Sequence, residues 1–137
     1  MATKKITTTN GELVDLMNGL FNVQDLKGKG FALKVHENMK SLQQVLEPVE
    51  EASKPTEEFV KFAQDVQKLQ QSKDSEGVQK LEESNPELVN ARKVQLEKVQ
   101  EMLKIEAKEI ELQVFTKEML PKDISGRQVT NLEKIII

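Results

Sequence analysis

The sequence predicts a mainly α-helical fold in which two long helices pair as an antiparallel, coiled-coil-like hairpin within one helical domain, residues 1–137. Apolar residues recur every three or four positions along the middle of the chain, which is the period of an α-helix. A polar stretch over 71–85 separates two such segments, and helices joined by a short connection pack antiparallel. Aromatic residues are only 4 % of the chain, all of them Phe, so narrow apolar seams are expected rather than a large aromatic core.

A first helix is predicted over residues 10–23. Thr9 and Glu12 have the spacing of a capping box, in which a hydroxyl and a carboxylate satisfy backbone amides at a helix start. Apolar residues follow at helical spacing, namely Leu13, Leu16, Met17 and Leu20. The chain is then expected to turn at its next glycines, Gly28 and Gly30.

A long helical pattern over 31–72 forms the first arm of the predicted hairpin. Its seam consists of Phe31, Val35, Leu42, Val45, Val49, Ala52, Phe59, Ala63 and Val66. Pro48 and Pro55 interrupt this pattern, because proline lacks the backbone donor and clashes with the preceding turn. Two interpretations remain open: one kinked helix, or two helices with a break near 53–55. We expect a kink at Pro48 and a break or stronger kink at Pro55, which suits the first turn of a new helix.

A polar loop over 71–77 is the expected tip of the hairpin, with a short helical turn over 78–83 behind it. The second arm is predicted over 86–108, with Pro86 in its first turn. Two neighbouring residues fit as its N-cap, Ser84 or Asn85. Apolar residues of this arm recur at seven-residue steps, at Val89, Leu96, Leu103 and Ile110. Each arm is therefore expected to bury its seam against the other.

Residues 110–116 are predicted to form a short β-strand because the apolar period changes there to two. The alternating residues are Ile110, Glu111, Leu112, Gln113 and Val114. A strand needs a partner, and two remain open: residues 3–8 of the same chain, or the same strand in another copy. A short C-terminal helix is predicted over 125–134.

The sequence ends with three β-branched apolar residues, Ile135-Ile136-Ile137. Burying such a side chain contributes about 1.5–3 kcal/mol, whereas free termini usually fray into water. Two interpretations remain open for this tail. It packs on the chain's own core, or it docks on a partner or a second copy.

No set of residues points to catalysis, a metal or a cofactor. His36 is the only histidine and cysteine is absent, so a transition-metal site lacks ligands. Adjacent acidic pairs at 50–51, 57–58 and 82–83 project about 100° apart on a helix and do not converge on one substrate atom. We therefore expect that the protein is not an enzyme and that it has no catalytic, metal-binding or cofactor-binding residues.

The charge distribution argues against two classes of partner. The net charge is −3, but residues 44–87 alone carry 5 basic and 11 acidic residues. A nucleic-acid binder usually has a basic stripe with interleaved aromatic residues, and this chain has none. No apolar run approaches the roughly 18 residues of a membrane-spanning helix. Neither nucleic acid nor a membrane is an expected partner.

Several short stretches resemble a group of small bacteriophage or prophage proteins of unknown function. The stretches lie at 9–13, 31–35, 38–42, 110–114, 120–121 and 131–136, so the resemblance covers nearly the whole chain. It implies a phage or prophage origin and no particular activity, and it supplies no catalytic residues. Pro48 and Pro55 depart from this group, in which the long helix is expected to be uninterrupted.

These observations predict a non-enzymatic, phage-encoded helical protein that acts by protein–protein contact as a minor virion or assembly component. The alternative is an accessory phage protein that binds a host protein, such as a defence factor, and inhibits or redirects it. Its location would be the virion or the host cytoplasm, and a homo-oligomer is a further option. The expected partner or oligomer surface consists of Ile110, Leu112, Val114, Phe115, Ile135, Ile136 and Ile137.

Overall fold

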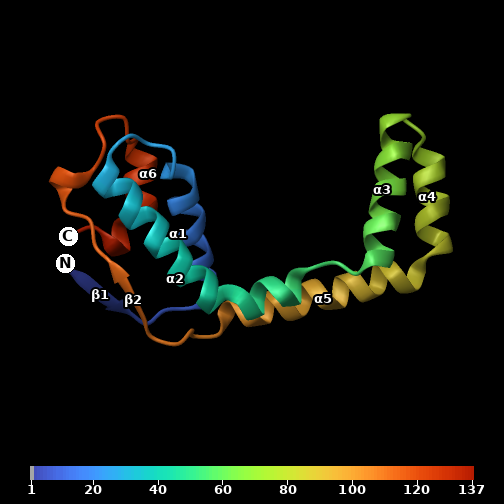
Figure 1. The fold of residues 1–137 in the computed structure, drawn as a ribbon. Helices are drawn as coiled ribbons and strands as arrows, with labels where there is room; N and C mark the ends of the chain where they lie inside the picture. Colours follow the sequence, from blue (N-terminus) through green and yellow to red (C-terminus); the bar gives the residue numbers. More distant parts are fainter. Residues whose placement is uncertain (1) are drawn as a thin grey trace. The chain divides into compact units, whose positions relative to one another are not determined.

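The computed structural model describes residues 2–137 and is mainly helical, with a short two-stranded antiparallel sheet (Figure 1). The chain forms two compact units. Unit 1 contains the chain up to Val49 together with Met102–Ile137, and unit 2 contains Glu50–Glu101. Among the described residues, no helix has both the length and the apolar character needed to cross a membrane.

Unit 1 begins with the predicted N-terminal helix, α1 (Asn10–Val23), whose bounds agree with the sequence pattern. The Thr9 hydroxyl accepts a hydrogen bond from the Glu12 amide at 3.2 Å, so Thr9 is the N-cap. The Glu12 carboxylate makes other contacts: it accepts from the Thr8 hydroxyl and lies 3.1 Å from the Lys134 ammonium. This carboxylate therefore links the start of α1 to the C-terminal segment.

The sheet pairs the two ends of unit 1. Strand β1 (Thr3–Ile6) lies antiparallel to β2 (Ile110–Gln113), with Ile6 opposite Ile110. Of the two partners left open by the sequence, the segment 3–8 of the same chain is therefore confirmed. The regular strand is shorter than the predicted 110–116 because β1 offers only four residues for pairing. Beyond it, Phe115 forms an isolated parallel bridge with Ile136.

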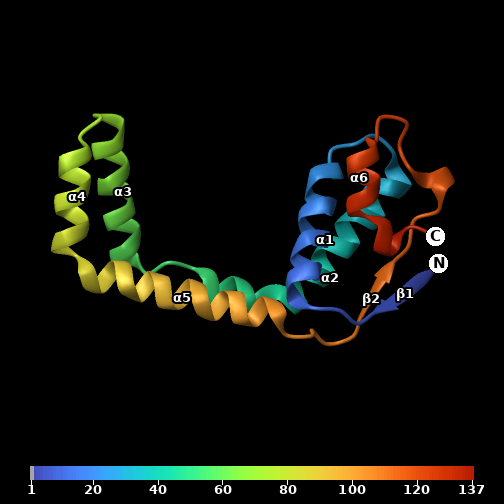
Figure 2. The ribbon, with the colours of Figure 1, turned by 180° about the vertical axis from the view of Figure 1, so that it is seen from behind.

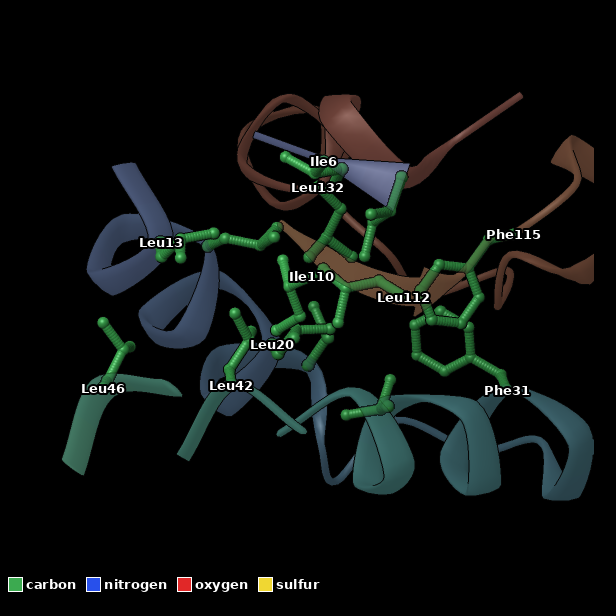
Figure 3. Packing of buried hydrophobic residues seen from close by; sticks show 14 residues of the cluster. Ile6, Leu13, Leu20, Phe31, Leu42, Leu46, Ile110, Leu112, Phe115 and Leu132 are labelled. Atoms are coloured by element: carbon green, nitrogen blue, oxygen red, sulfur yellow. The ribbon is translucent and has the colours of Figure 1, made fainter. Parts of the chain in front are cut away.

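The hydrophobic core of unit 1 lies between α1, the first part of α2 (Lys29–Ser53) and the sheet, and Figure 3 shows its packing. Phe31 of α2 faces Phe115, with ring centroids 5.0 Å apart. The C-terminal segment adds Leu132 and Ile135, both fully buried. Burial of these side chains is the main stabilising contribution to unit 1.

The C-terminal segment is helical, but in two pieces rather than the single helix predicted over 125–134. Helix α6 (Gly126–Asn131) packs against α1, as both Figures 1 and 2 show. Ser125 and Gln128 complete a reciprocal capping box at its start. A 3₁₀ turn, Glu133–Ile135, follows and directs Ile135 into the core.

The long first arm is two helices, which confirms the break proposed near Pro55. Helix α2 is continuous through Pro48 and ends at Ser53, and α3 (Glu57–Gln71) follows after three residues. Thr56 is the N-cap of α3, because its hydroxyl accepts from the Phe59 amide at 3.2 Å. Pro55 therefore precedes the cap and does not lie in the first helical turn, as the sequence had suggested.

The tip between α3 and the next helix is tighter than the loop predicted over 71–77. Helix α4 (Ser75–Ser84) begins directly after Asp74, whose carboxylate accepts from the Gly77 amide at 2.9 Å. It therefore starts earlier and is longer than the predicted turn over 78–83. In Figures 1 and 2, α3 and α4 lie side by side.

Helix α5 (Pro86–Lys104) starts where predicted and ends four residues before position 108. Neither proposed N-cap side chain bonds to it: Ser84 donates to Lys80 O and Asn85 donates to Leu81 O, both in α4. The helical pair joined by the tip is α3 with α4, and the coiled-coil-like hairpin of two long arms is not confirmed.

Candidate functional site: an apolar groove in unit 2

The residues predicted as a partner surface lie mainly inside unit 1. Five of them are buried: Ile110, Leu112, Val114, Phe115 and Ile135. Ile136 is half-buried, and only Ile137 is well exposed, at 61 %. The apolar side chains that the sequence suggested as a contact surface instead pack against α1 and α2 inside unit 1. The prediction of a surface is therefore corrected for the five buried residues. Of the tail, Ile135 packs on the chain's own core, whereas Ile137 remains exposed.

Unit 2, in contrast to unit 1, buries few of its apolar side chains. In the described chain, Phe62 is the only hydrophobic residue of Glu50–Glu101 that is fully buried, at 8 % exposure. Helices α4 and α5 have no buried residue at all. Valine and leucine side chains therefore remain open to solvent on α5, where Val89 is 40 % and Leu96 is 43 % exposed.

These exposed side chains line a groove of about 640 Å³ within unit 2. Its apolar wall is made by α3 and α5 and consists of Phe59, Phe62, Ala63, Val66, Val89 and Leu96. Phe59 and Phe62 lie one turn apart on α3, with ring centroids 5.7 Å apart and planes tilted by 46°. Tilted contact of this kind is a favourable arrangement for two aromatic rings, and the pair supplies most of the aromatic surface of the groove.

Arg92 of α5 fixes the start of α3 beside the groove. Its guanidinium lies over the Phe59 ring, 5.5 Å from the centroid, which is a cation–π arrangement. Its Nη1 also donates to Ser53 O at 2.9 Å and to Gln95 Oε1 at 3.0 Å. The same cation therefore satisfies a carbonyl at the end of α2 and covers the first aromatic ring of α3.

Gln95, one turn further along α5, holds the same break in the chain. Its Nε2 donates to Ala52 O at 2.8 Å and to Lys54 O at 2.6 Å. The bond to Ala52 O replaces an intrahelical bond that this carbonyl lacks at the end of α2, and the bond to Lys54 O fixes the first residue of the break. The sequence analysis missed Arg92 and Gln95 because the helical period identifies apolar positions only. No sequence signal indicates that these side chains bond to carbonyls about forty positions away.

The charged side chains that line the groove balance one another. Glu82 of α4 and Glu97 of α5 are acidic, and Arg92 and Lys93 of α5 are basic. A smaller hollow shares Glu82, Val89 and Lys93 with the groove and adds Glu83. Unit 2 as a whole has 12 acidic and 8 basic residues, for a net charge of −4.

The described residues contain no group of three or more His, Cys, Asp or Glu side chains arranged to hold a metal ion. His36 lies exposed on α2, and both members of each adjacent acidic pair are exposed as well. The groove is lined by both apolar and polar side chains, a combination that suits packing against another molecule.

Comparison with known proteins gives no match for this chain among protein-family models, curated proteins or solved structures.

Proposed function

We propose that this chain is a non-enzymatic bacteriophage protein that works by protein–protein contact, as a minor virion or assembly component, in the virion or the host cytoplasm. The observation that carries the proposal is the groove of unit 2, whose apolar wall includes Phe59, Val89 and Leu96. Contiguous exposed apolar surface bounded by polar residues is typical of protein interaction sites. The phage assignment is supported only by the sequence resemblance.

The thin core of unit 2 supports the same proposal. A unit of this size buries a limited share of its apolar surface, and here a single hydrophobic side chain is fully buried among its residues. A partner that covered the groove would add the burial that unit 2 lacks, at roughly 25 cal/mol per Å² of apolar surface. The seven-residue step from Val89 to Leu96 supports a coiled-coil-like contact, with the partner supplying the second helix.

A second candidate function is an accessory protein that binds a host protein and inhibits or redirects it. The acidic character of unit 2 favours this candidate, because complementary charge raises the rate at which a basic target is captured. The two candidates use the same groove and differ in the partner, so one experiment separates them.

The test is capture of partners from a native infected lysate with the tagged full chain, read by quantitative mass spectrometry. The wild type is compared with Leu96→Ser, which makes the groove wall polar, and with Val94→Ser as the matched control. Val94 lies on the same helix with a similar exposure, 41 % against 43 %, and does not line the groove.

Capsid or tail proteins captured by the wild type and by Val94→Ser, but not by Leu96→Ser, would support the virion role. The protein should then also be present at a fixed copy number in purified particles. One stoichiometric host protein with the same dependence on Leu96 would support the alternative. If no captured protein depends on Leu96, contact through this groove is wrong.

A further inference from the structure

We propose that α3 and α4 move as one piece about two proline junctions, and that this movement closes the groove of unit 2 onto α5. The junctions are Lys54-Pro55, between α2 and α3, and Asn85-Pro86, between α4 and α5. The movement itself is a property of unit 2. Its regulatory consequence, that the closed chain hides the contact surface from a partner, rests on the proposed function.

The α3–α4 pair is connected to the rest of unit 2 at two places where helical backbone is lost. Residues 54–56 are not helical, and Asn85 has φ −128° and ψ 51°. The turn at 72–74 closes the opposite end of the pair, so both junctions lie at one end, as Figures 1 and 2 show. The residue before a proline avoids helical backbone, and hinges consist of a few such residues at the ends of elements.

At both junctions, side chains bond to carbonyls that backbone amides would satisfy in a continuous helix. Gln95 Nε2 donates to Ala52 O at 2.8 Å, and Asn85 Nδ2 donates to Leu81 O at 2.9 Å. These donors lie on side chains with rotatable bonds. The backbone of each junction can therefore rotate while these carbonyls keep their partners, which lowers the cost of the movement.

The α3–α4 pair is weakly fastened to α5. Among the described residues, no hydrogen bond or ion pair joins 57–84 to α5. The one directional contact is the Arg92 guanidinium over the Phe59 ring, at 5.5 Å from the centroid. Phe59 lies in the first turn of α3, directly beside the hinge, so a rotation of α3 changes this distance least.

The groove has an apolar face on each of the two helices that closure would bring together. Val89 and Leu96 on α5 are 40 % and 43 % exposed, and they lie across the groove from the apolar side chains of α3. Folding the pair toward the carboxyl end of α5 would bring Val66 toward Gln100, since both line the groove farthest from the junctions. Closure therefore buries apolar surface that the open form leaves in water.

The charges of the groove also suit closure of the chain on itself. Its two acidic side chains, Glu82 and Glu97, are matched by two basic ones, Arg92 and Lys93. Charges that are removed from water need partners of opposite sign. A closed groove would contain both signs in equal number, so it needs no charge from another molecule.

Distances between pairs of spin labels, measured by electron spin resonance, test the movement in the full chain. The chain has no cysteine, so labels attach only at introduced ones. The reporting pair is Gln71→Cys with Glu101→Cys, at the far end of α3 and on α5. The control pair, Lys61→Cys with Lys80→Cys, lies within the α3–α4 pair. All four positions are exposed.

Helix α3 has 15 residues, so it is about 22 Å long and a rotation of about 30° displaces its far end by about 10 Å. We expect the 71–101 distances to spread over at least about 10 Å, with separations shorter than that of the open form. The 61–80 pair should give one narrow distance, because α3 and α4 move together. A 71–101 distance as narrow as the control would overturn the inference.

The apolar contact made on closure is tested with the same labels. Leu96→Ser should reduce the population of short 71–101 distances at least about threefold, because it removes apolar surface that closure buries. Val94→Ser, at a similar exposure outside the groove, should leave the distances unchanged. Circular dichroism verifies that both variants keep their helical content. Equal effects of the two substitutions would contradict closure onto this face of α5.

The regulatory consequence is tested by locking the groove closed. The double variant Val66→Cys with Gln100→Cys should form a disulfide when treated with oxidised glutathione, because closure brings these positions together. Failure to form it would contradict this direction of movement. The locked form should capture any Leu96-dependent partner at least about tenfold less than the same variant after reduction, which is the matched control.

The outcomes separate this inference from the proposed function. If the short distances depend on Leu96 but no captured protein does, the movement is supported and contact through the groove is wrong. If a partner depends on Leu96 but the 71–101 distance is single and narrow, the groove is a contact site and the hinge is wrong. Equal capture by the locked and reduced forms would mean that closure does not control the contact.

Discussion

The side chain of Asn38 pairs with the backbone of Gln113 through two hydrogen bonds. Asn38 Nδ2 donates to Gln113 O at 2.9 Å, and Asn38 Oδ1 accepts from Gln113 N at 2.8 Å. Asn38 is 1 % exposed and is the buried polar residue of α2. The carboxamide of Asn38 therefore bonds the backbone of Gln113 as a neighbouring strand would. It satisfies the amide and the carbonyl at the end of β2, which point away from β1.

Replacing Asn38 with Ala should destabilise unit 1 by about 2–4 kcal/mol, since two backbone groups of Gln113 would lose their partners in a buried site. Asn38→Asp should also destabilise, because a carboxylate accepts from the Gln113 amide but cannot donate to its carbonyl. Urea unfolding followed by far-UV circular dichroism measures the effect. Asn18→Ala, at an exposed position on α1, is the control and should change stability little. A similar loss for Asn18→Ala and Asn38→Ala would contradict the role of this pair.

The C-terminal isoleucines should contribute unequally to stability. Ile135→Ala should cost about 3 kcal/mol because the side chain is fully buried in the core of unit 1. Ile137→Ala should cost less than about 0.5 kcal/mol, because that side chain is 61 % exposed. Thermal unfolding of both variants measures the difference. Truncation after Lys134 should be as damaging as Ile135→Ala or more so, since it also removes the bonds between Phe115 and the backbone of Ile135 and Ile137. Unchanged stability of the truncated chain would mean that the tail is not part of the core.

Replacing each of two helical glycines with Ala should change the stability of the protein in opposite directions. A Cβ on Gly19 would lie 3.0 Å from Asn131 Cβ and 3.2 Å from Asn131 O, so Gly19→Ala should push α1 and α6 apart and destabilise by about 1–3 kcal/mol. A Cβ on Gly30 meets nothing within 4 Å, so Gly30→Ala should stabilise by about 0.5–1 kcal/mol through helix propensity. Denaturant midpoints measure both effects. Stabilisation by Gly19→Ala would show that α1 and α6 are not in close contact.

Replacing Lys73 with glycine should stabilise the end of α3. It has a φ of 58° and ends α3 with the hydrogen-bond pattern of a Schellman motif, Asp74 N to Leu69 O and Lys73 N to Gln70 O. Lys73→Gly should stabilise unit 2 by about 1 kcal/mol, because glycine adopts this backbone conformation without a Cβ clash. Ser72→Gly, at a φ of −81°, is the control and should destabilise slightly. Hydrogen exchange of the α3 and α4 amides reports stability in this unit. Faster exchange in Lys73→Gly would contradict the prediction.

Local patterns determined several elements of this fold. The Thr9 cap and the apolar spacing behind it were sufficient for α1, because both depend on residues within a few positions of each other. The start of α5 at Pro86 and the break after Ser53 follow from proline geometry, which is also local. The change of period at Ile110 identified β2 for the same reason.

Only the tertiary structure decided which apolar side chains are covered. In sequence, the apolar residues of 110–115 and the isoleucine tail looked like an interaction surface. Ile110, Leu112, Val114, Phe115 and Ile135 are instead core, because β1 and α2 pack on them from distant parts of the chain. Phe59, Val89 and Leu96 looked like an internal seam, and they line an open groove because the chain breaks at 54–56 and Arg92 and Gln95 hold that break. The sequence by itself determined α1, the break between α2 and α3, the start of α5 and the start of β2, since these signals are short-range. Which faces are buried depends on contacts between residues tens of positions apart, and periodicity alone carries no information about them.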